Sequence, residues 1–71
     1  MIQTAPKTPT EILEAALGRE RQAYEFYSKL ADNCRIEGIK ELLEKLRDEE
    51  QKHIQMIDKM LTQVRLGHEP V

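Results

Sequence analysis

The chain is 71 residues long, which is enough for one domain and no more. Charged residues make up 34% of it, but the formal net charge is only −2 and no basic stripe is visible, so the charge pattern does not indicate nucleic-acid binding. No apolar run approaches the roughly 20 residues of a membrane-spanning helix, and the N-terminus lacks the pattern of a signal peptide. We therefore expect a cytoplasmic protein that contacts neither nucleic acid nor a membrane.

So short a chain buries little apolar surface by itself, and small domains usually add disulfides, a metal or a partner chain. Cys34 is the only cysteine, which rules out a disulfide within the chain. A bound metal or a second chain therefore remains as the expected source of stability.

The first seven residues show no periodicity, and we expect residues 1–7 to form a flexible N-terminal arm. A strong helix start follows them. Thr8 can cap the helix, Pro9 suits its first turn, and Glu11 completes a capping box. The first helix is therefore predicted to begin at Pro9.

This first helix is predicted to end at about Asp32, and Gly18 inside it should weaken it by about 1 kcal/mol relative to alanine. The stretch 33–36 is the only plausible break in the middle of the chain. A second helix should follow from residue 36 or 37 to residue 65 or 66, and Gly67 directly after it suits a helix cap.

No strand pattern competes with these helices, so the predicted fold class is all-α: an antiparallel two-helix hairpin over residues 8–66, with a C-terminal tail at 67–71. A short turn forces the helices to run antiparallel. If the turn is centred near residue 35, facing residues have numbers that sum to about 70. Glu20 and Glu50 then share one level, roughly 22 Å from the turn at 1.5 Å per residue.

Each predicted helix carries an apolar stripe with steps of three and four residues, and three polar residues interrupt the two stripes. The stripes comprise Leu13, Leu17, Glu20, Tyr24, Tyr27 and Ala31, and Ile39, Leu43, Leu46, Glu50, His53, Ile57, Met60 and Val64. A buried carboxylate is costly unless something pairs with it. Glu50 and His53 project from one face of their helix because they are three residues apart. We therefore interpret Glu20, Glu50 and His53 as metal ligands.

Three protein ligands leave a transition metal under-coordinated, and a single hairpin cannot close a core. Both needs are met if two hairpins pair about a two-fold axis into a four-helix bundle. Its central layer would hold four glutamates and two histidines, whose four negative charges two divalent cations would neutralise. Carboxylate and imidazole ligands suit iron or manganese, with zinc as an alternative. The expected assembly is a homodimer, or a higher homo-oligomer, with two metal ions per dimer.

At these residues the chain resembles the rubrerythrin and ferritin-like family of di-iron proteins. Glu20 is followed by a small residue, Ala23, and then by Tyr27, as in the first ligand helix of that family. Glu50 and His53 match its Glu-x-x-His motif.

Because the chain carries two helices where most members of the family carry four, it is similar to the encapsulated ferritins, whose two-helix protomers build a di-iron ferroxidase site across a dimer interface. The resemblance implies a ferritin-like four-helix bundle, two irons per dimer, and oxidation of Fe(II) by oxygen or peroxide. It adds an encapsulin shell as a further partner and compartment. The chain departs from encapsulated ferritins at Arg19 and Gln22, near positions where they carry extra carboxylates.

Three functional hypotheses follow. The first is a ferroxidase-type oxidoreductase for iron storage or detoxification, in which Glu20, Glu50 and His53 bind the metal and take part in catalysis. Tyr27 then packs in the core, and its hydroxyl can bond to a ligand carboxylate or end an electron path. The second is a non-catalytic dimerisation module whose polar layer fixes the register. The third is a structural zinc or manganese site without redox activity.

Overall fold

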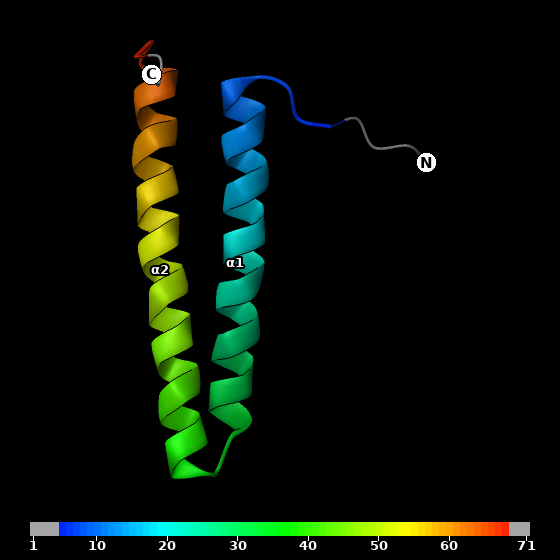
Figure 1. Ribbon diagram of the computed structural model, residues 1–71, viewed down its shortest axis with the longest axis vertical. Coiled ribbons are helices and arrows are strands. Elements are labelled where there is room, and N and C mark those ends of the chain that lie inside the picture. Colours follow the sequence, from blue (N-terminus) through cyan, green and yellow to red (C-terminus); the bar gives the residue numbers. More distant parts are fainter. Residues whose placement is uncertain (1–4, 69–71) are drawn as a thin grey trace.

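The computed structural model describes residues 5–68, and this part of the chain contains two α-helices and no strand. Helix α1 spans Pro9–Asn33 and helix α2 spans Glu37–Arg65. The helices run antiparallel and side by side, so that the start of α1 and the end of α2 lie together at the open end of the hairpin (Figure 1). The predicted all-α hairpin is confirmed, with each helix boundary within one residue of its predicted position.

The start of α1 is fixed by the predicted capping box. The Thr8 hydroxyl accepts a hydrogen bond of 3.1 Å from the Glu11 backbone N–H, and the Glu11 carboxylate accepts one of 3.1 Å from the Thr8 backbone N–H. These bonds satisfy two N–H groups that have no partner within the helix. Because they stabilise the ionised carboxylate, they also lower the pKa of Glu11.

The end of α2 is fixed by Gly67, which has the left-handed backbone conformation (φ 85°). Its N–H donates to the Val64 carbonyl at 3.0 Å, and the His68 N–H donates to the Gln63 carbonyl at 2.9 Å. This pair of bonds is the Schellman motif, and it confirms the predicted glycine cap. The predicted arm and tail fall partly on residues 1–4 and 69–71, which lie outside the described residues.

The hairpin buries very little apolar surface. Among residues 5–68 the buried apolar side chains are Leu17, Ala31 and Leu61. Large apolar side chains that remain 41–70% exposed are Ile12, Phe26, Leu30, Ile36, Ile39, Leu42, Met56 and Leu66. One helix pair alone therefore leaves many large apolar side chains in contact with water, as expected of so short a chain.

An ion pair links the two helices at the open end. The Arg65 guanidinium donates to the Glu14 carboxylate at 3.1 Å, and both side chains are more than half exposed, so the pair contributes little to stability. Charged residues are spread along both helices, and neither α1 nor α2 has the long apolar stretch that crossing a membrane requires.

Candidate metal centre

Three ionisable side chains from the two helices converge on one point. His53 Nδ1 lies 3.4 Å from Oε2 of Glu20 and 3.5 Å from Oε2 of Glu50. One potential ligand atom from each residue lies within 4.8 Å of the other two. The register inferred from the short turn thus brings together the three residues selected from the sequence.

The cluster lies at the middle of both helices. Glu20 is the twelfth of the 25 residues of α1, and Glu50 is the fourteenth of the 29 residues of α2. His53 follows Glu50 by one turn and projects from the same face. Helix interiors hold side chains more precisely than loops do, so the three donors start from well-defined positions.

The three side chains differ in exposure. The exposed fraction is 17% for the Glu50 side chain, 29% for Glu20 and 45% for His53. Oε2 of Glu50 is itself buried and has no hydrogen-bond partner in the described part of the chain. A buried oxygen without a donor costs roughly 1–3 kcal/mol. A cation bound between the helices would remove that cost.

Mutual contacts shift all three pKa values. The neighbouring Glu20 carboxyl, which can share a proton with Glu50, raises the pKa of Glu50, and desolvation raises it further. The same contact lowers the pKa of Glu20, and His53 lowers it as well. Glu20 also raises the pKa of His53. The raised pKa values of Glu50 and His53 mean that each keeps its proton to a higher pH than usual, and a divalent cation competes with that proton for the same atoms.

The donor set fits a metal ion. Carboxylate oxygens and imidazole nitrogens that share one ion lie roughly 3–4 Å apart, given bonds of about 2.0–2.2 Å. The distances from His53 Nδ1 to the two carboxylates, 3.4 and 3.5 Å, fall in this range. Iron, manganese and zinc all accept such donors. Three donors leave coordination positions open for ligands from elsewhere.

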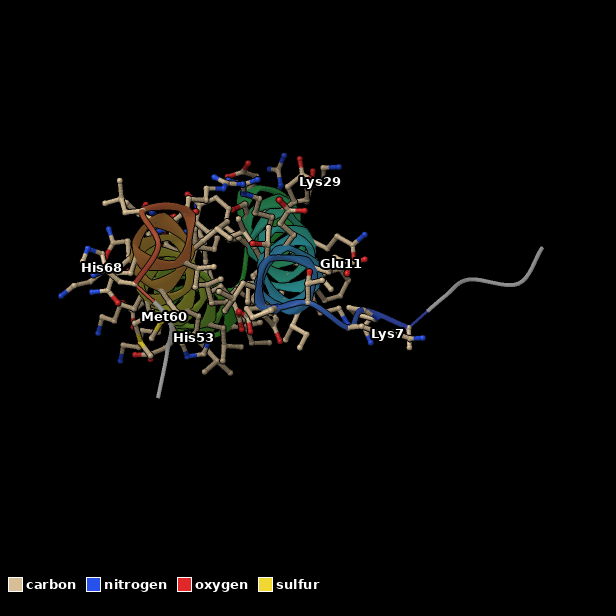
Figure 2. All side chains as sticks on the ribbon, turned by 90° about the horizontal axis from the view of Figure 1, so that it is seen from above. Lys7, Glu11, Lys29, His53, Met60 and His68 are labelled. Carbon is tan, nitrogen blue, oxygen red and sulfur yellow. The ribbon has the colours of Figure 1, made fainter. Side chains whose placement is uncertain are left out.

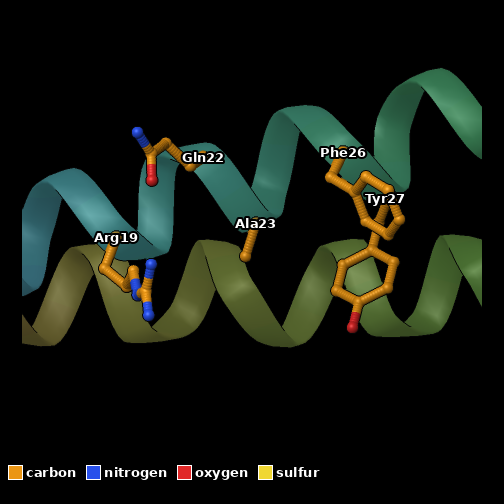
Figure 3. A pocket seen from close by; sticks show the side chains of 5 residues that line it. All are labelled: Arg19, Gln22, Ala23, Phe26 and Tyr27. Carbon is orange, nitrogen blue, oxygen red and sulfur yellow. The ribbon is translucent and has the colours of Figure 1, made fainter.

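Tyr27 lies two turns beyond Glu20 on α1. Its ring meets the Phe26 ring edge to face, with a centroid distance of 5.4 Å and an interplanar angle of 65°. Both aromatic rings line a hollow of about 400 Å³ together with Arg19, Gln22 and Ala23 (Figure 3). The packing role predicted for Tyr27 agrees with this position, and a bond from its hydroxyl to a ligand carboxylate stays a prediction.

The sequence analysis did not predict this hollow. Arg19 and Phe26 lie outside the stripe of α1 that faces α2, so a search for one core-facing stripe passes over them. The steps of three and four that connect Arg19, Ala23 and Phe26 are the signal that shows a second stripe.

The fold and the cluster define a class of small helical proteins: an α-hairpin that presents two carboxylates and an imidazole at mid-length as a candidate metal centre. Residues 11–71 match the family model of rubrerythrin, so the chain belongs to the rubrerythrin family, as the sequence resemblance predicted. Searches of curated proteins and of solved structures found no match. Membership of this family points to iron as the bound metal.

Proposed function

We propose that two copies of this chain bind two iron ions through Glu20, Glu50 and His53 of each copy, and that the pair oxidises Fe(II) with oxygen or peroxide. The observation that carries the proposal is the convergence of these three donors in a chain of the rubrerythrin family, with a buried oxygen of Glu50 that has no hydrogen-bond partner among residues 5–68.

The second copy is proposed because one hairpin supplies too few metal ligands and too little buried apolar surface. The described residues bring three donors to the site, and an iron ion usually takes more. Within residues 5–68 the hairpin buries three apolar side chains and leaves eight large ones exposed. A second hairpin placed over the site adds donors and covers apolar surface at the same time.

In this proposal the residues act by binding, neutralising and excluding water. Glu20 and Glu50 balance the charge of the cations in their ionised form. His53 binds through an unprotonated ring nitrogen, so cations compete with protons for Glu50 and for His53. Leu17 and Tyr24 flank Glu20 on α1 by one turn on either side and shield the layer from water. Iron, when bound, supplies the electrons that reduce the oxidant.

Native mass spectrometry of metal-free protein, before and after anaerobic addition of Fe(II), tests the binding step. We expect a dimer that gains two irons. Glu50→Gln should abolish that gain, because the neutral amide is a poor ligand. Glu41→Gln, which removes an exposed carboxylate from the same helix, is the matched control and should bind iron normally.

Exposure of the loaded protein to oxygen or peroxide then tests the reaction. Absorbance of the ferric product should rise in the wild type and in Glu41→Gln but not in Glu50→Gln. Binding without oxidation would favour a structural metal site instead. A protein that takes up no metal in any state would contradict the proposal and favour the dimerisation module.

A further inference from the structure

The hollow of about 400 Å³ on α1 has the composition of a small-molecule site. Its lining residues are Arg19, Gln22, Ala23, Phe26 and Tyr27 (Figure 3). All five belong to one helix, so the hollow needs neither α2 nor a second copy of the chain to form. Aromatic and apolar walls with a few groups that donate hydrogen bonds are typical of sites for small ligands. The proposed function makes no use of this hollow.

The hollow exists because a small side chain lies between large ones. Arg19, Ala23 and Tyr27 follow one another at intervals of four residues, so they form one row along the helix, one turn apart. Figure 3 shows Arg19 and Tyr27 at opposite ends of this row, with Ala23 between them. The methyl group of Ala23 is therefore the floor of the hollow, and the two longer side chains are its ends.

Arg19 supplies a positive charge at one end of the hollow. The residues three and four positions away from it are three alanines and Gln22, so no acidic side chain lies at the helical spacing that favours ion pairs. None of the ion pairs among residues 5–68 includes Arg19, whereas Arg47 and Arg65 each contact an acidic side chain. The guanidinium N–H groups of Arg19 are therefore available to an anion.

Gln22 adds a second donor at the same end. It follows Arg19 by three residues, so the two side chains are neighbours on the helix surface. A guanidinium binds a carboxylate through two parallel N–H groups, and a carboxamide N–H can bind a remaining lone pair of the same carboxylate. This end of the hollow thus suits a carboxylate better than a neutral group.

The other end suits an aromatic ring. The rings of Phe26 and Tyr27 meet edge to face with a centroid distance of 5.4 Å, and Phe26 is 58% exposed. A third ring placed over Ala23 can contact both of them in the offset or edge-to-face geometries that aromatic groups prefer. Such a ring also removes exposed apolar surface of Phe26 from water, which stabilises the complex.

We propose that the hollow binds a small aromatic carboxylate, with its carboxylate on Arg19 and Gln22 and its ring over Ala23 against Phe26 and Tyr27. Arg19 and Tyr27 are eight residues apart, or roughly 12 Å at 1.5 Å per residue. The long side chain of Arg19 occupies part of this interval and leaves room for one ring and its carboxylate. The volume of about 400 Å³ lies in the range of small-molecule sites.

This ligand site adjoins the metal cluster but does not depend on it. Ala23 and Tyr27 follow Glu20 by three and seven residues, so all three lie on one side of α1. The carboxylate of Glu20 itself lies 3.4 Å from His53 Nδ1, in the cluster, and is not part of the lining of the hollow. Because no metal ion takes part in the proposed contacts, the inference can fail while the proposed function holds, and the reverse.

Titration of the metal-free protein with benzoate, followed by ¹H–¹⁵N NMR, tests the inference. Metal is left out because a carboxylate also binds to metal ions. We expect the resonances of the Arg19 Nε–H, the Gln22 side-chain amide and the Ala23 backbone amide to shift together. The dissociation constant should be on the order of 1 mM for so small a ligand. Acetate, which lacks the ring, and benzyl alcohol, which lacks the charge, should each bind about tenfold more weakly.

Two variants and a control locate the binding. Arg19→Gln should weaken benzoate binding about tenfold, because it removes the charged donor. Arg21→Gln is the matched control, since it makes the same change at an exposed position of α1 outside the hollow, and it should bind like the wild type. Ala23→Leu fills the floor of the hollow and should abolish binding, while circular dichroism verifies that its helices form.

Three results would overturn the inference. The first is equal affinity of Arg19→Gln and the wild type for benzoate. The second is a set of shifts at Ile12 and Met60 in place of those at Arg19, because these two residues line an apolar hollow without a charged group at the open end of the hairpin. The third is the absence of any shift up to about 20 mM benzoate, well above the expected dissociation constant. None of these results changes the expectation for iron binding, which native mass spectrometry tests separately.

Discussion

Glu50 combines two properties that conflict in the isolated hairpin. Its side chain is only 17% exposed, and its buried oxygen Oε2 has no hydrogen-bond partner within residues 5–68. Contact with Glu20 and desolvation both raise its pKa, which shows that the ionised form is disfavoured there. A structural role alone would be served better by leucine, which also suits the stripe. A cation bound beside Glu50 would therefore explain why a carboxylate occupies this position.

Replacing this residue should separate stability from binding. In metal-free protein, Glu50→Leu should raise the free energy of unfolding by about 1–2 kcal/mol, because it removes a largely desolvated carboxyl group whose Oε2 accepts no hydrogen bond among the described residues. The variant should also lose the stabilisation that Zn²⁺ or Fe(II) gives to the wild type. Urea unfolding at fixed protein concentration, with and without metal, measures both effects.

The control for this substitution is Glu41→Leu, at an exposed position of the same helix. It should change the stability of the metal-free protein little and keep the metal-dependent gain. A metal-free Glu50→Leu variant that is less stable than the wild type would mean that Glu50 has a stabilising partner without metal.

At the scale of the helix, the capping box of α1 predicts a pH-dependent effect. The pKa of Glu11 is lowered in the folded chain, so the carboxylate stabilises the helix above the ordinary glutamate pKa of about 4.3. That contribution is lost as the pH falls through the lowered folded value. Glu11→Gln should therefore destabilise the protein at pH 7, and the difference from the wild type should shrink as the pH falls below the ordinary glutamate pKa.

Thr8→Ala tests the other half of the same cap. It removes the acceptor for the Glu11 backbone N–H and should lower the free energy of unfolding by about 1 kcal/mol at pH 7. Thermal unfolding followed by circular dichroism measures both variants. Equal stability of Thr8→Ala and the wild type would show that the first turn of α1 frays in solution.

The middle of α1 offers a gain in stability. A Cβ atom added at Gly18 meets no atom within 4 Å, so alanine fits there without displacing a neighbour. Gly18→Ala should raise the free energy of unfolding by up to about 1 kcal/mol, because alanine favours the helix. A lower melting temperature would instead mean that another chain approaches Gly18 closely in the assembly.

Local signals explain why the helices could be predicted from the sequence. Thr8, Glu11 and Gly67 fix the ends through bonds that span a few residues, and the short turn sets the register that brings Glu20 to Glu50. The exposure of large apolar residues beside the inward-facing stripes was not predicted, because a single repeating pattern already accounted for one face of each helix. Whether Phe26 or Met56 is covered depends on what packs against it, and the exposed fractions of the hairpin supply that information.

The whole molecule has the properties of half a bundle. Large apolar side chains such as Phe26, Leu42 and Met56 stay exposed, and a cluster of ionisable groups lies between the helices at mid-length. Exposed apolar surface on a small protein marks an interaction site. Because the proposed function places the cluster between two copies, binding of metal and binding of a second copy should stabilise each other.

A charge placed at an exposed apolar position should weaken the proposed association of two copies. Phe26→Asp puts a carboxylate where the proposed interface is apolar, at a position six residues from Glu20 and outside the donor cluster. An unpaired charge at a packed interface costs more than 1.4 kcal/mol, so the dimer dissociation constant should rise at least about tenfold. Sedimentation equilibrium of the Zn²⁺-loaded protein measures this change.

Lys29→Asp is the matched control, since Lys29 is exposed on α1 and lies on the side opposite His53 and Met60 (Figure 2). It alters the net charge by two units, whereas Phe26→Asp alters it by one, so any general effect of charge should be larger in the control. If only Phe26→Asp weakens the dimer, the position of the charge at Phe26 is the cause. If both variants remain as dimeric as the wild type, the second copy binds elsewhere and the metal site must be completed by another surface.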